Sequence, residues 1–453
     1  MKCLILAAGK GSRLQQRHSV KPLLPLLGVP LIERGVRSAI EAGIDSFVVV
    51  LGHAQEQVRE FLQQLARRLQ VSIETVINPQ WHCSENGRSV LAAEPLLPEP
   101  FVLLMADHLV EPVLLRRLLQ NTPPEDGLLL AVDRSMDNPL VDLQDVTKVA
   151  LATADHGYSI RAIGKTLQTF NAYDTGVFYC TPGIFSAIRY CAQAGDSSLS
   201  AAVGRLASAG RAVAVDVSGM LWCDIDDPAA YARAQRALLQ HARGKSRDGP
   251  VSRWLNRPLS ISLSRLLVAT PVTPNQISLF SFVLSAVAAW LFTCQGYLAL
   301  VLGGVLAQAA SVIDGCDGEV ARLKYLRSDY GGWFDAVLDR YADALLLFGL
   351  TWHALTQSSA GTAAQLVLVA GFMAIIGSFM LSYTADKYDG MMARRSQAAA
   401  WLMPFRLGRD VRVMLVFVGA LLNQVEATLW LIAVLMNLET LRRIIVCRES
   451  CVK

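Results

Sequence analysis

Four aspartates are spaced so that they could bind metal between two apolar segments. Asp314 and Asp317 are three residues apart near the end of one apolar stretch. Asp335 and Asp339 are four residues apart at the start of the next. Residues at these spacings share a helix face, so two facing helix ends would gather all four carboxylates. Such a group repels itself strongly unless cations neutralise it, which predicts a metal site; a solvated acidic loop is the alternative.

The fixed positions around these acids match a known signature. From Asp314 the chain reads Asp-Gly-Cys-Asp-Gly-Glu-Val-Ala-Arg, and after eight more residues Gly-Gly-Trp-Phe-Asp-Ala-Val-Leu-Asp. This pattern resembles the CDP-alcohol phosphotransferases, membrane enzymes that move a phosphoalcohol from a CDP-alcohol to a second hydroxyl and release CMP. The resemblance implies that the four aspartates bind Mg²⁺ or Mn²⁺ and that Asp339 also deprotonates the acceptor, in keeping with the preference of these ions for carboxylate oxygens. It also implies that Gly318, Ala321 and Arg322 shape the CDP pocket.

Composition changes sharply about halfway along the 453 residues. Residues 1–245 mix charged and apolar residues as a soluble domain does, whereas 277–446 contain stretches long enough to cross a bilayer. Composition therefore predicts a soluble domain followed by an all-α membrane domain with six spans. The six spans are predicted at 277–294, 296–313, 331–352, 363–384, 411–424 and 427–446.

The placement of basic residues predicts the topology. Lys and Arg cluster between spans two and three, between spans four and five, and after span six, but are absent from 294–296, 353–363 and 423–426. This asymmetry places both termini and the four aspartates on the cytoplasmic side of an inner membrane that the chain crosses several times. The first apolar run is too short for a signal peptide, so the first domain is also expected in the cytoplasm.

Cysteine usage and net charge exclude some classes of protein. The nine cysteines show no Cys-x-x-Cys spacing, which favours reduced thiols over disulfides or a zinc site. A formal charge of +4 suggests no nucleic-acid partner. The local basic clusters are better explained by phosphate substrates and membrane lipid head groups.

The amino-terminal region has a separate phosphate-binding pattern. A buried-strand pattern over residues 2–8 runs into Gly9-Lys-Gly-Ser-Arg-Leu, and Lys21-Pro follows. Backbone N–H groups of a glycine-rich turn can approach triphosphate oxygens, and Arg13 and Lys21 can offset their charge. A tight structural turn is the alternative reading of the glycines.

Together, these residues resemble the opening motif of the sugar-phosphate nucleotidyltransferases, a Rossmann-like α/β family that joins an NTP to a sugar phosphate. The resemblance implies catalytic roles for Arg13 and Lys21. It implies nucleotide contacts from Ala7, Ala8, Gly9, Gly11 and Lys21, and from Asn86, Gly87 and Ser89 in a loop that recognises base and ribose. For this second group, a plain turn is the alternative.

Two acidic positions are candidates for a metal in this domain. Asp107 follows the buried-strand pattern Phe-Val-Leu-Leu-Met, and α/β sheets present ligands at strand carboxyl ends. The resemblance makes it a Mg²⁺ ligand, and a helix cap or turn is the alternative. Asp224 or Asp226 would supply the second carboxylate, with Asp226 slightly favoured, while Asp227 could cap the following helix.

Two further motifs indicate the sugar phosphate. Gly164-Lys165 and Asp174-Thr-Gly resemble the inositol-1-phosphate cytidylyltransferases, whose domains occur fused to a CDP-alcohol phosphotransferase in this order. The resemblance implies that Lys165 contacts the substrate phosphate and Asp174 a ring hydroxyl. A surface lysine and a turn aspartate are the alternatives.

The sequence thus predicts a cytoplasmic nucleotidyltransferase domain over 1–240, a polar linker over 241–250, an interfacial amphipathic segment over 251–275 and a membrane domain over 276–453. Within the last, Lys387, Arg409 and Arg412 are candidates to bind the acceptor's phosphate. Positive-inside anchoring is the alternative explanation for these cations.

The hypothesis from these patterns is a bifunctional enzyme. It would make CDP-inositol from CTP and inositol 1-phosphate, then transfer phosphoinositol to a second inositol 1-phosphate. Alternatives are transfer to a diradylglycerol, which gives an inositol phospholipid, a different CDP-alcohol or NTP, or a nucleotide-sensing membrane scaffold or transporter. The resemblance also suggests a homodimer formed through the membrane domain.

Overall fold

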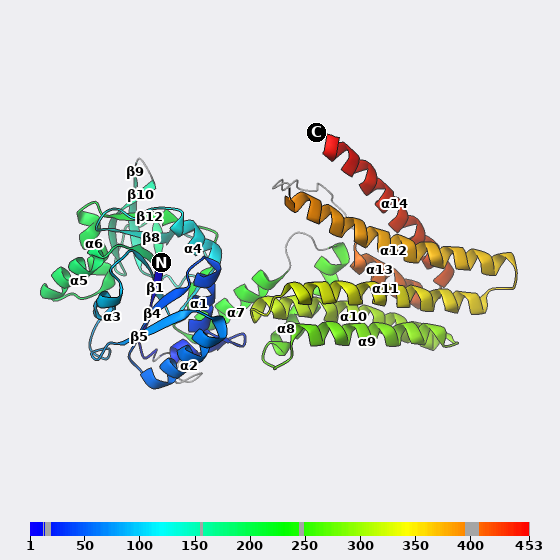
Figure 1. The fold of residues 1–453 in the computed structure, drawn as a ribbon, viewed down its shortest axis with the longest axis horizontal. Helices are drawn as coiled ribbons and strands as arrows, with labels where there is room; N and C mark the ends of the chain where they lie inside the picture. The colour runs from blue at the N-terminus through cyan, green and yellow to red at the C-terminus, as the bar shows by residue number, and fades with distance from the viewer. Residues whose placement is uncertain (12, 14–19, 155–156, 244–248, 395–406, 453) are drawn as a thin grey trace. The chain divides into compact units, whose positions relative to one another are not determined.

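The computed structural model describes residues 1–453 apart from 12, 14–19, 155–156, 244–248, 395–406 and 453. The chain divides into two compact units, Met1–Leu238 and Leu239–Lys453 (Figure 1). Residues 244–248 of the expected linker lie outside the described residues, as do 395–406 between the fourth and fifth expected spans.

The first unit is built on a mixed sheet. Among the described residues this sheet has nine strands in the order β5-β4-β1-β6-β11-β8-β12-β10-β9. The strands are β1 (Lys2–Ala7), β4 (Ser46–Leu51), β5 (Ser72–Ile77), β6 (Phe101–Met105), β8 (Leu128–Asp133), β9 (Lys148–Ala154), β10 (Gly157–Gly164), β11 (Ala172–Cys180) and β12 (Ala212–Asp216). Two short ribbons pair β2 (Pro25–Leu26) with β3 (Val29–Pro30), and β7 (His108–Val110) with β13 (Trp222–Asp224).

Helices cover both faces of this sheet (Figure 1). On one face lie α1 (Leu31–Glu41), α2 (Gln55–Leu69) and α4 (Pro112–Leu119), and on the other α3 (Asn86–Ala92), α5 (Gly183–Gln193) and α6 (Leu199–Ser208). Successive residues of a strand point to opposite faces, so Ile5 and Val49 join the first core while Leu4 and Val48 join the second. Central strands buried on both faces read as continuous apolar runs, as in β4. The remaining elements are α7 (Pro228–Ala242) and the 3₁₀ turns η2 (Lys21–Leu23) and η3 (Glu94–Leu96).

Strand direction brings distant loops together. β1 runs parallel to both β4 and β6, so the carboxyl ends of β1 and β6 lie at one edge of the sheet. The glycine turn after Ala7 and the acid Asp107 after Met105 therefore meet there. Beyond β6 the sheet is no longer parallel, because β11 is antiparallel to both β6 and β8.

The second unit is helical. It contains a short π-helical turn, η4 (Ser252–Asn256), and α8 (Arg257–Leu267), α9 (Pro274–Thr293), α10 (Tyr297–Leu323), α11 (Asp329–Gln357), α12 (Thr362–Arg394), α13 (Arg409–Leu421) and α14 (Val425–Val452). Helix α9 begins where the Thr-Pro-Asn-Gln sequence predicts. The Thr273 hydroxyl accepts from the backbone N–H of Gln276, whose side chain accepts in return from the backbone N–H of Thr273.

Three helices within the described residues are long and apolar enough to cross a membrane: α9, α10 and the Thr362–Lys387 part of α12. Helices α11, α13 and α14 coincide with the other three expected spans but do not meet that standard. Helix α11 carries Asp335, Asp339, Arg340 and Asp343, and α13 is only 13 residues long. The six-span count therefore remains a prediction.

The segment expected to be interfacial is amphipathic in the structure. Asn256, Ser260 and Ser264 are buried on one side of η4 and α8, whereas Trp254 is 81% exposed and Leu266 is 68% exposed. The polar side of this segment thus packs into the unit, and the apolar side is uncovered within the described residues.

Candidate active sites

The first site lies at the carboxyl ends of β1 and β6. A cavity of about 280 Å³ there is lined by Leu6, Ala7, Gly9, Gly11, Arg13, Lys21, Pro22, Ala106, Asp107 and Asp226. These are residues from three segments far apart in sequence, and most were candidates from the sequence. The structure therefore brings together the glycine turn, both expected cations and two of the expected acids.

Lys21 is the electrostatic centre of this cavity. Its side chain is 7% exposed, and its Nζ lies 2.6 Å from Asp107 Oδ2 and also pairs with Asp226 Oδ1. Burial alone would lower the pKa of Lys21, but the negative charges of Asp107, Asp226 and Asp224 outweigh it and raise the pKa above its usual range. Burial would likewise raise the pKa of Asp107, yet the Lys21 charge and the His108 contact hold it well below its usual range.

A second group beside Lys21 is arranged to hold a cation. Ligand atoms of Asp107, His108 and Asp224 all lie within 4.8 Å of one another. The Asp224 Oδ1 atom is buried and has no hydrogen-bond partner. Burial raises the pKa of Asp224 to about 7, against the opposing charge of His108. An orphaned buried carboxylate oxygen fits a divalent cation.

The sequence left open whether Asp224 or Asp226 supplies the second metal-binding carboxylate, and the geometry of the site bears on this choice. Asp226, slightly favoured from the sequence, is occupied by Lys21, whereas Asp224 groups with Asp107 and His108. Because Lys21 also pairs with Asp107, its contact does not exclude Asp226; the grouping with Asp107 and His108 makes Asp224 the better candidate for a metal ligand. Asp227 caps α7 through its Oδ1, which accepts from the backbone N–H of Ala230 at 2.7 Å. His108 was missed, although it directly follows the predicted acid.

The glycine turn makes a specific prediction at Gly11. This residue has φ +61, and a Cβ there would lie 2.5 Å from Lys21 Cβ and 2.6 Å from Lys21 Cδ. The change Gly11→Ala should therefore displace Lys21 and strain the backbone by about 1 kcal/mol. We expect cytidylyl transfer to fall at least roughly tenfold, the rate factor that corresponds to about 1.4 kcal/mol in the transition state. Initial rates of CDP-inositol formation measure this.

The matched control for this variant is Gly35→Ala in α1. Nothing lies within 4 Å of a Cβ at Gly35 and its φ is not positive. Because alanine has a higher helix propensity than glycine, the change should leave the stability of α1 unchanged or raise it. Equal rates for both variants would contradict the close approach of Gly11 to Lys21.

The residues expected to contact base and ribose are placed differently. Asn86, Gly87 and Ser89 form the start of helix α3 rather than a loop or plain turn. The Gly87 N–H donates to Ser197 O at 3.1 Å, and buried Ser89 Oγ accepts from Asn78 Nδ2 at 3.0 Å. Gly87 and Ser89 thus support the interior, and exposed Asn86 remains the better candidate for nucleotide contact.

The sugar-side candidates lie near the same edge. Asp174 is on β11, where its Oδ1 accepts from the backbone N–H of Gly176 at 2.8 Å, and burial raises its pKa to about 6. Gly176 has φ +72, and a Cβ there would lie 2.6 Å from the His108 ring, so this glycine lets β11 approach His108. Lys165 forms an ion pair with Asp145, in which the Lys165 Nζ atom lies 2.6 Å from Asp145 Oδ1.

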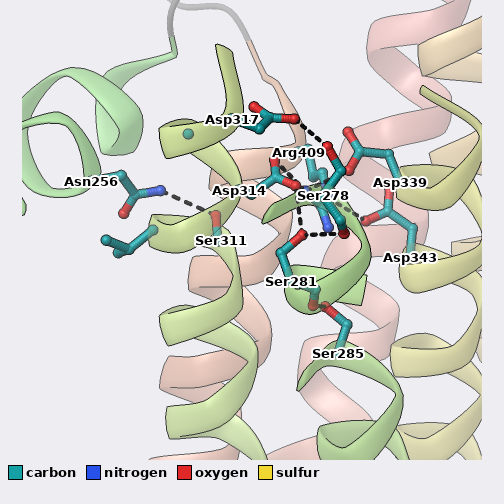
Figure 2. Close-up of polar contacts among 12 residues, drawn as sticks. Asn256, Ser278, Ser281, Ser285, Ser311, Asp314, Asp317, Asp339, Asp343 and Arg409 are labelled. Atoms are coloured by element: carbon teal, nitrogen blue, oxygen red, sulfur yellow. Dashed lines mark hydrogen bonds and ion pairs between the residues drawn. The ribbon is translucent and has the colours of Figure 1, made fainter. Parts of the chain in front are cut away.

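The second site is formed by α9, α10, α11 and α13 (Figure 2). Ligand atoms of Asp314, Asp335 and Asp339 lie within 4.8 Å of one another, which gathers three of the four predicted carboxylates. Asp335 Oδ1 is buried without a hydrogen-bond partner, so this group also fits a divalent cation. Asp317 is not one of these three, but its carboxyl group lies next to that of Asp335 and also accepts from Ser278 Oγ at 2.5 Å.

Arg409 joins the acids of two helices. Its NH1 lies 2.8 Å from Asp314 Oδ2 and 2.7 Å from Asp339 Oδ1 (Figure 2). Its Nε is 3.3 Å from Asp343, which also pairs with Arg412 at 2.5 Å. Arg409 and Arg412 therefore both contact α11, the helix that carries Asp339 and Asp343. The sequence predicted only that these arginines lie on the same side of the membrane as the aspartates.

Several residues of this site were missed. Asp343 continues the four-residue spacing from Asp339, which was a readable signal. Ser278 and Ser281 hold Asp317 and Asp314 from α9, the latter at 3.0 Å (Figure 2). Polar residues three apart in an apolar span were the signal for these serines.

A cavity of about 420 Å³ opens beside Asp314 and Asp339. Its lining includes the cations Arg257, Arg340, Arg409, Arg412 and Arg443, and the polar residues Ser252, Asn256, Ser260, Ser311 and Ser382. Lys387 is not part of this lining; its Nζ lies 5.6 Å from the centre of the Tyr383 ring. Arg322 donates from Nε to Ala242 O at 2.7 Å and has a buried, unpartnered NH2, while Gly318 packs next to its guanidinium.

A buried acid fixes α8 against the helix that carries Asp314 and Asp317. Glu319 is fully buried and accepts from Arg257 NH1 at 2.9 Å, Ser260 Oγ at 2.7 Å and Ser264 Oγ at 2.7 Å. Next to it, the Cys316 thiol donates to Ser260 O at 3.4 Å and is fully buried. Helix α8 thereby closes one wall of the cavity.

We expect Glu319→Gln to loosen α8, because an amide offers one acceptor where three donors converge. Losing buried hydrogen bonds of this kind costs about 1–3 kcal/mol. The melting temperature in detergent should fall, and maleimide labelling of Cys316, mapped by peptide mass, should become faster. Glu426→Gln, at the exposed first turn of α14, is the control. Unchanged Cys316 labelling would show that other contacts hold α8.

Comparison with known proteins agrees with the division into two units. Residues 3–171 match the family model of the MobA-like NTP transferase domain, and residues 271–434 match that of the CDP-alcohol phosphatidyltransferases. The bifunctional IPC transferase and DIPP synthase of Rubrobacter xylanophilus is 37% identical over 98% of this chain and 96% of its own. The protein of the same name from Aquifex aeolicus is 30% identical over 97% of this chain and 96% of its own.

A shorter relative matches only part of the chain. The archaetidylinositol phosphate synthase of Pyrococcus horikoshii is 26% identical over 40% of this chain and 87% of its own. The second unit, with its three apolar helices and its phosphatidyltransferase match, is a membrane-associated domain. From its near full-length similarity to two such relatives, the chain belongs to the family of bifunctional IPC transferases and DIPP synthases.

Proposed function

We propose that the chain makes CDP-inositol from CTP and inositol 1-phosphate, and then transfers phosphoinositol from CDP-inositol to a second inositol 1-phosphate. The observation that carries this proposal is the presence of two acid groups, each beside its own cation-lined cavity. Both groups have a buried carboxylate oxygen without a partner, which supports a divalent cation, with Mg²⁺ as our proposal, at each.

In the first step, a phosphate oxygen of inositol 1-phosphate attacks the α-phosphorus of CTP, and pyrophosphate leaves. The turn around Gly9 and Gly11 leaves room for the triphosphate, and Lys21 and Arg13 offset the charge that develops on it. Asp107 and Asp224 would hold the metal, which supplies further neutralisation of the phosphates when bound. We assign Asp174 to accept a hydrogen bond from a ring hydroxyl of inositol 1-phosphate.

In the second step, a hydroxyl of the acceptor attacks the phosphorus that carries inositol in CDP-inositol, and CMP leaves. We assign the proton of that hydroxyl to the Asp339 carboxylate. Asp314 and Asp335 would share the metal with Asp339, and Arg409 would offset charge on the phosphates. We assign Arg322 to the nucleotide side, which its buried NH2 without a hydrogen-bond partner supports.

The lining of the larger cavity favours inositol 1-phosphate as the acceptor. Its arginines suit a phosphate, and Asn256 and Ser311 suit ring hydroxyls. A diradylglycerol carries no phosphate for these arginines to bind. The similarity to an archaetidylinositol phosphate synthase keeps the lipid acceptor as a second candidate.

The membrane arrangement is part of the proposal. We infer six spans with both sites on the cytoplasmic face, because basic residues lie at the carboxyl end of α10 and before α13 but are absent from 294–296, and nucleotides are cytoplasmic. The exposed apolar side of η4 and α8 would lie on lipid. A homodimer through the second unit is the expected assembly.

Mass spectrometry of products tests the function. The full chain, in nanodiscs with or without a diradylglycerol, receives Mg²⁺, one of four NTPs and a phosphate of inositol, choline or glycerol. We expect CDP-inositol followed by di-myo-inositol phosphate phosphate and CMP. An inositol phospholipid instead would assign the lipid acceptor, and a different nucleotide–alcohol pair would overturn the inositol assignment.

A further inference from the structure

Asp145, which was not among the predicted site residues, forms ion pairs with two cations that were, Arg13 and Lys165. Asp145, in the segment between β8 and β9, places Oδ2 2.5 Å from Arg13 NH1 and Oδ1 2.6 Å from Lys165 Nζ. Arg13 lies 132 positions away in sequence and Lys165 lies 20 away. Each carboxylate oxygen therefore serves a different cation, and the two cations converge from separate segments.

These two cations are the ones assigned to the phosphates of the two substrates. Arg13 lines the cavity that Lys21 and Asp107 share, and Lys165 was assigned to the sugar phosphate. Both cations are more than half exposed, at 61% and 59% of the side chain, whereas Asp145 is only 25% exposed. Exposed pairs contribute little to stability, so folding gives little reason for this arrangement.

The Asp145 carboxylate is ionised at neutral pH. Hydrogen bonds from Lys165 and Arg13 lower the pKa of Asp145 to about 2. A permanent anion with two acceptor oxygens thus occupies a position between the nucleotide side and the sugar side. A phosphate group offers the same charge sign and the same kind of acceptor oxygens.

We propose that Asp145 is a placeholder for substrate phosphate, which holds Arg13 and Lys165 in the free enzyme and yields them when CTP and inositol 1-phosphate bind. The inference rests on the proposed cytidylyl transfer. Because substrate must displace Asp145, the carboxylate weakens ground-state binding and favours release of pyrophosphate. A ligand that competes with an internal contact binds more weakly by the free energy of that contact.

The test measures affinity rather than turnover. Full-length Asp145→Asn in detergent is titrated calorimetrically with pyrophosphate and with inositol 1-phosphate at fixed salt. Removing two exposed ion pairs should tighten binding of both anions roughly threefold to tenfold. In a Lys165→Gln background the gain for inositol 1-phosphate should shrink, because the cation assigned to that substrate's phosphate is then absent.

A matched control lies in the same segment. Asp142 accepts from the backbone N–H of Gln144 at 3.0 Å, and no ion pair to it occurs in the described part of the chain. Asp142→Asn should leave both affinities unchanged.

Unchanged or weaker anion binding in Asp145→Asn, with a melting temperature like that of the wild type, would overturn the placeholder role. Failure of the wild-type chain to form CDP-inositol would instead overturn the proposed function, so the two failures are distinguishable.

Discussion

Asp339→Asn is expected to reduce CMP release from CDP-inositol by roughly 10²–10⁴-fold, the usual effect of removing a general base. Asparagine keeps the shape of the side chain but cannot take the acceptor's proton. It also removes one of the three carboxylates that group with Asp314 and Asp335. Synthesis of CDP-inositol in the first unit should continue, so CDP-inositol should accumulate. Chromatography of CMP and CDP-inositol from CTP and inositol 1-phosphate follows both steps in one reaction.

Asp329→Asn is the matched control for this variant. Asp329 lies in the exposed first turn of the same helix, away from the cavity that Asp339 lines. Its replacement should change CMP release less than about twofold, since a charge at a helix end contributes only a few tenths of a kcal/mol at an exposed position. If Asp339→Asn released CMP at the wild-type rate, the base would have to be sought elsewhere. Loss of both activities together would indicate misfolding.

The acids of the second site were predictable because a membrane segment leaves few explanations for them. Charged residues at helical spacing in an apolar setting must share a face and be neutralised, which predicts that Asp314, Asp317, Asp335 and Asp339 group together. Three of them, Asp314, Asp335 and Asp339, do so within 4.8 Å. The residues that neutralise these aspartates were harder to predict. Arg409 was a candidate only because it was predicted on the same side of the membrane as the aspartates. Its ion pairs with acids of two helices, and the hydrogen bond from Ser278 to Asp317, do not follow from any local sequence pattern.

The first unit shows the same limit. The strand, glycine turn and Lys21 could be placed from the sequence because parallel strands end at one edge of the sheet. The antiparallel insertion of β11 between β6 and β8 could not, since it pairs segments far apart in the chain. That insertion sets Gly176 against His108. Asp145 could not be predicted for a related reason. Its proposed role depends on two cations that are distant in the sequence, and no sequence motif marks the residue.

Lys21→Gln is expected to reduce CDP-inositol formation by roughly 10²–10³-fold, as when one preorganised electrostatic partner of a transition state is removed. Lys21 is also the cation between Asp107 and Asp226. Breaking a buried ion pair typically costs about 3–5 kcal/mol, because the remaining charges are left uncompensated. The melting temperature of the first unit should therefore fall. Rates are measured by mass spectrometry of CDP-inositol from the full chain.

The same preparation supplies the internal control, because transfer from added CDP-inositol requires only the second unit and should keep its wild-type rate. Lys2→Gln is the external control. Lys2 begins β1, at the end of that strand away from the cavity. It pairs with Glu74 at 2.9 Å and is partly exposed, so its loss should change CDP-inositol formation less than about twofold. A Lys21→Gln enzyme that kept its CDP-inositol rate within about threefold of wild type, less than 1 kcal/mol, would remove Lys21 from the chemistry. Its burial between two acids would then be a matter of stability alone.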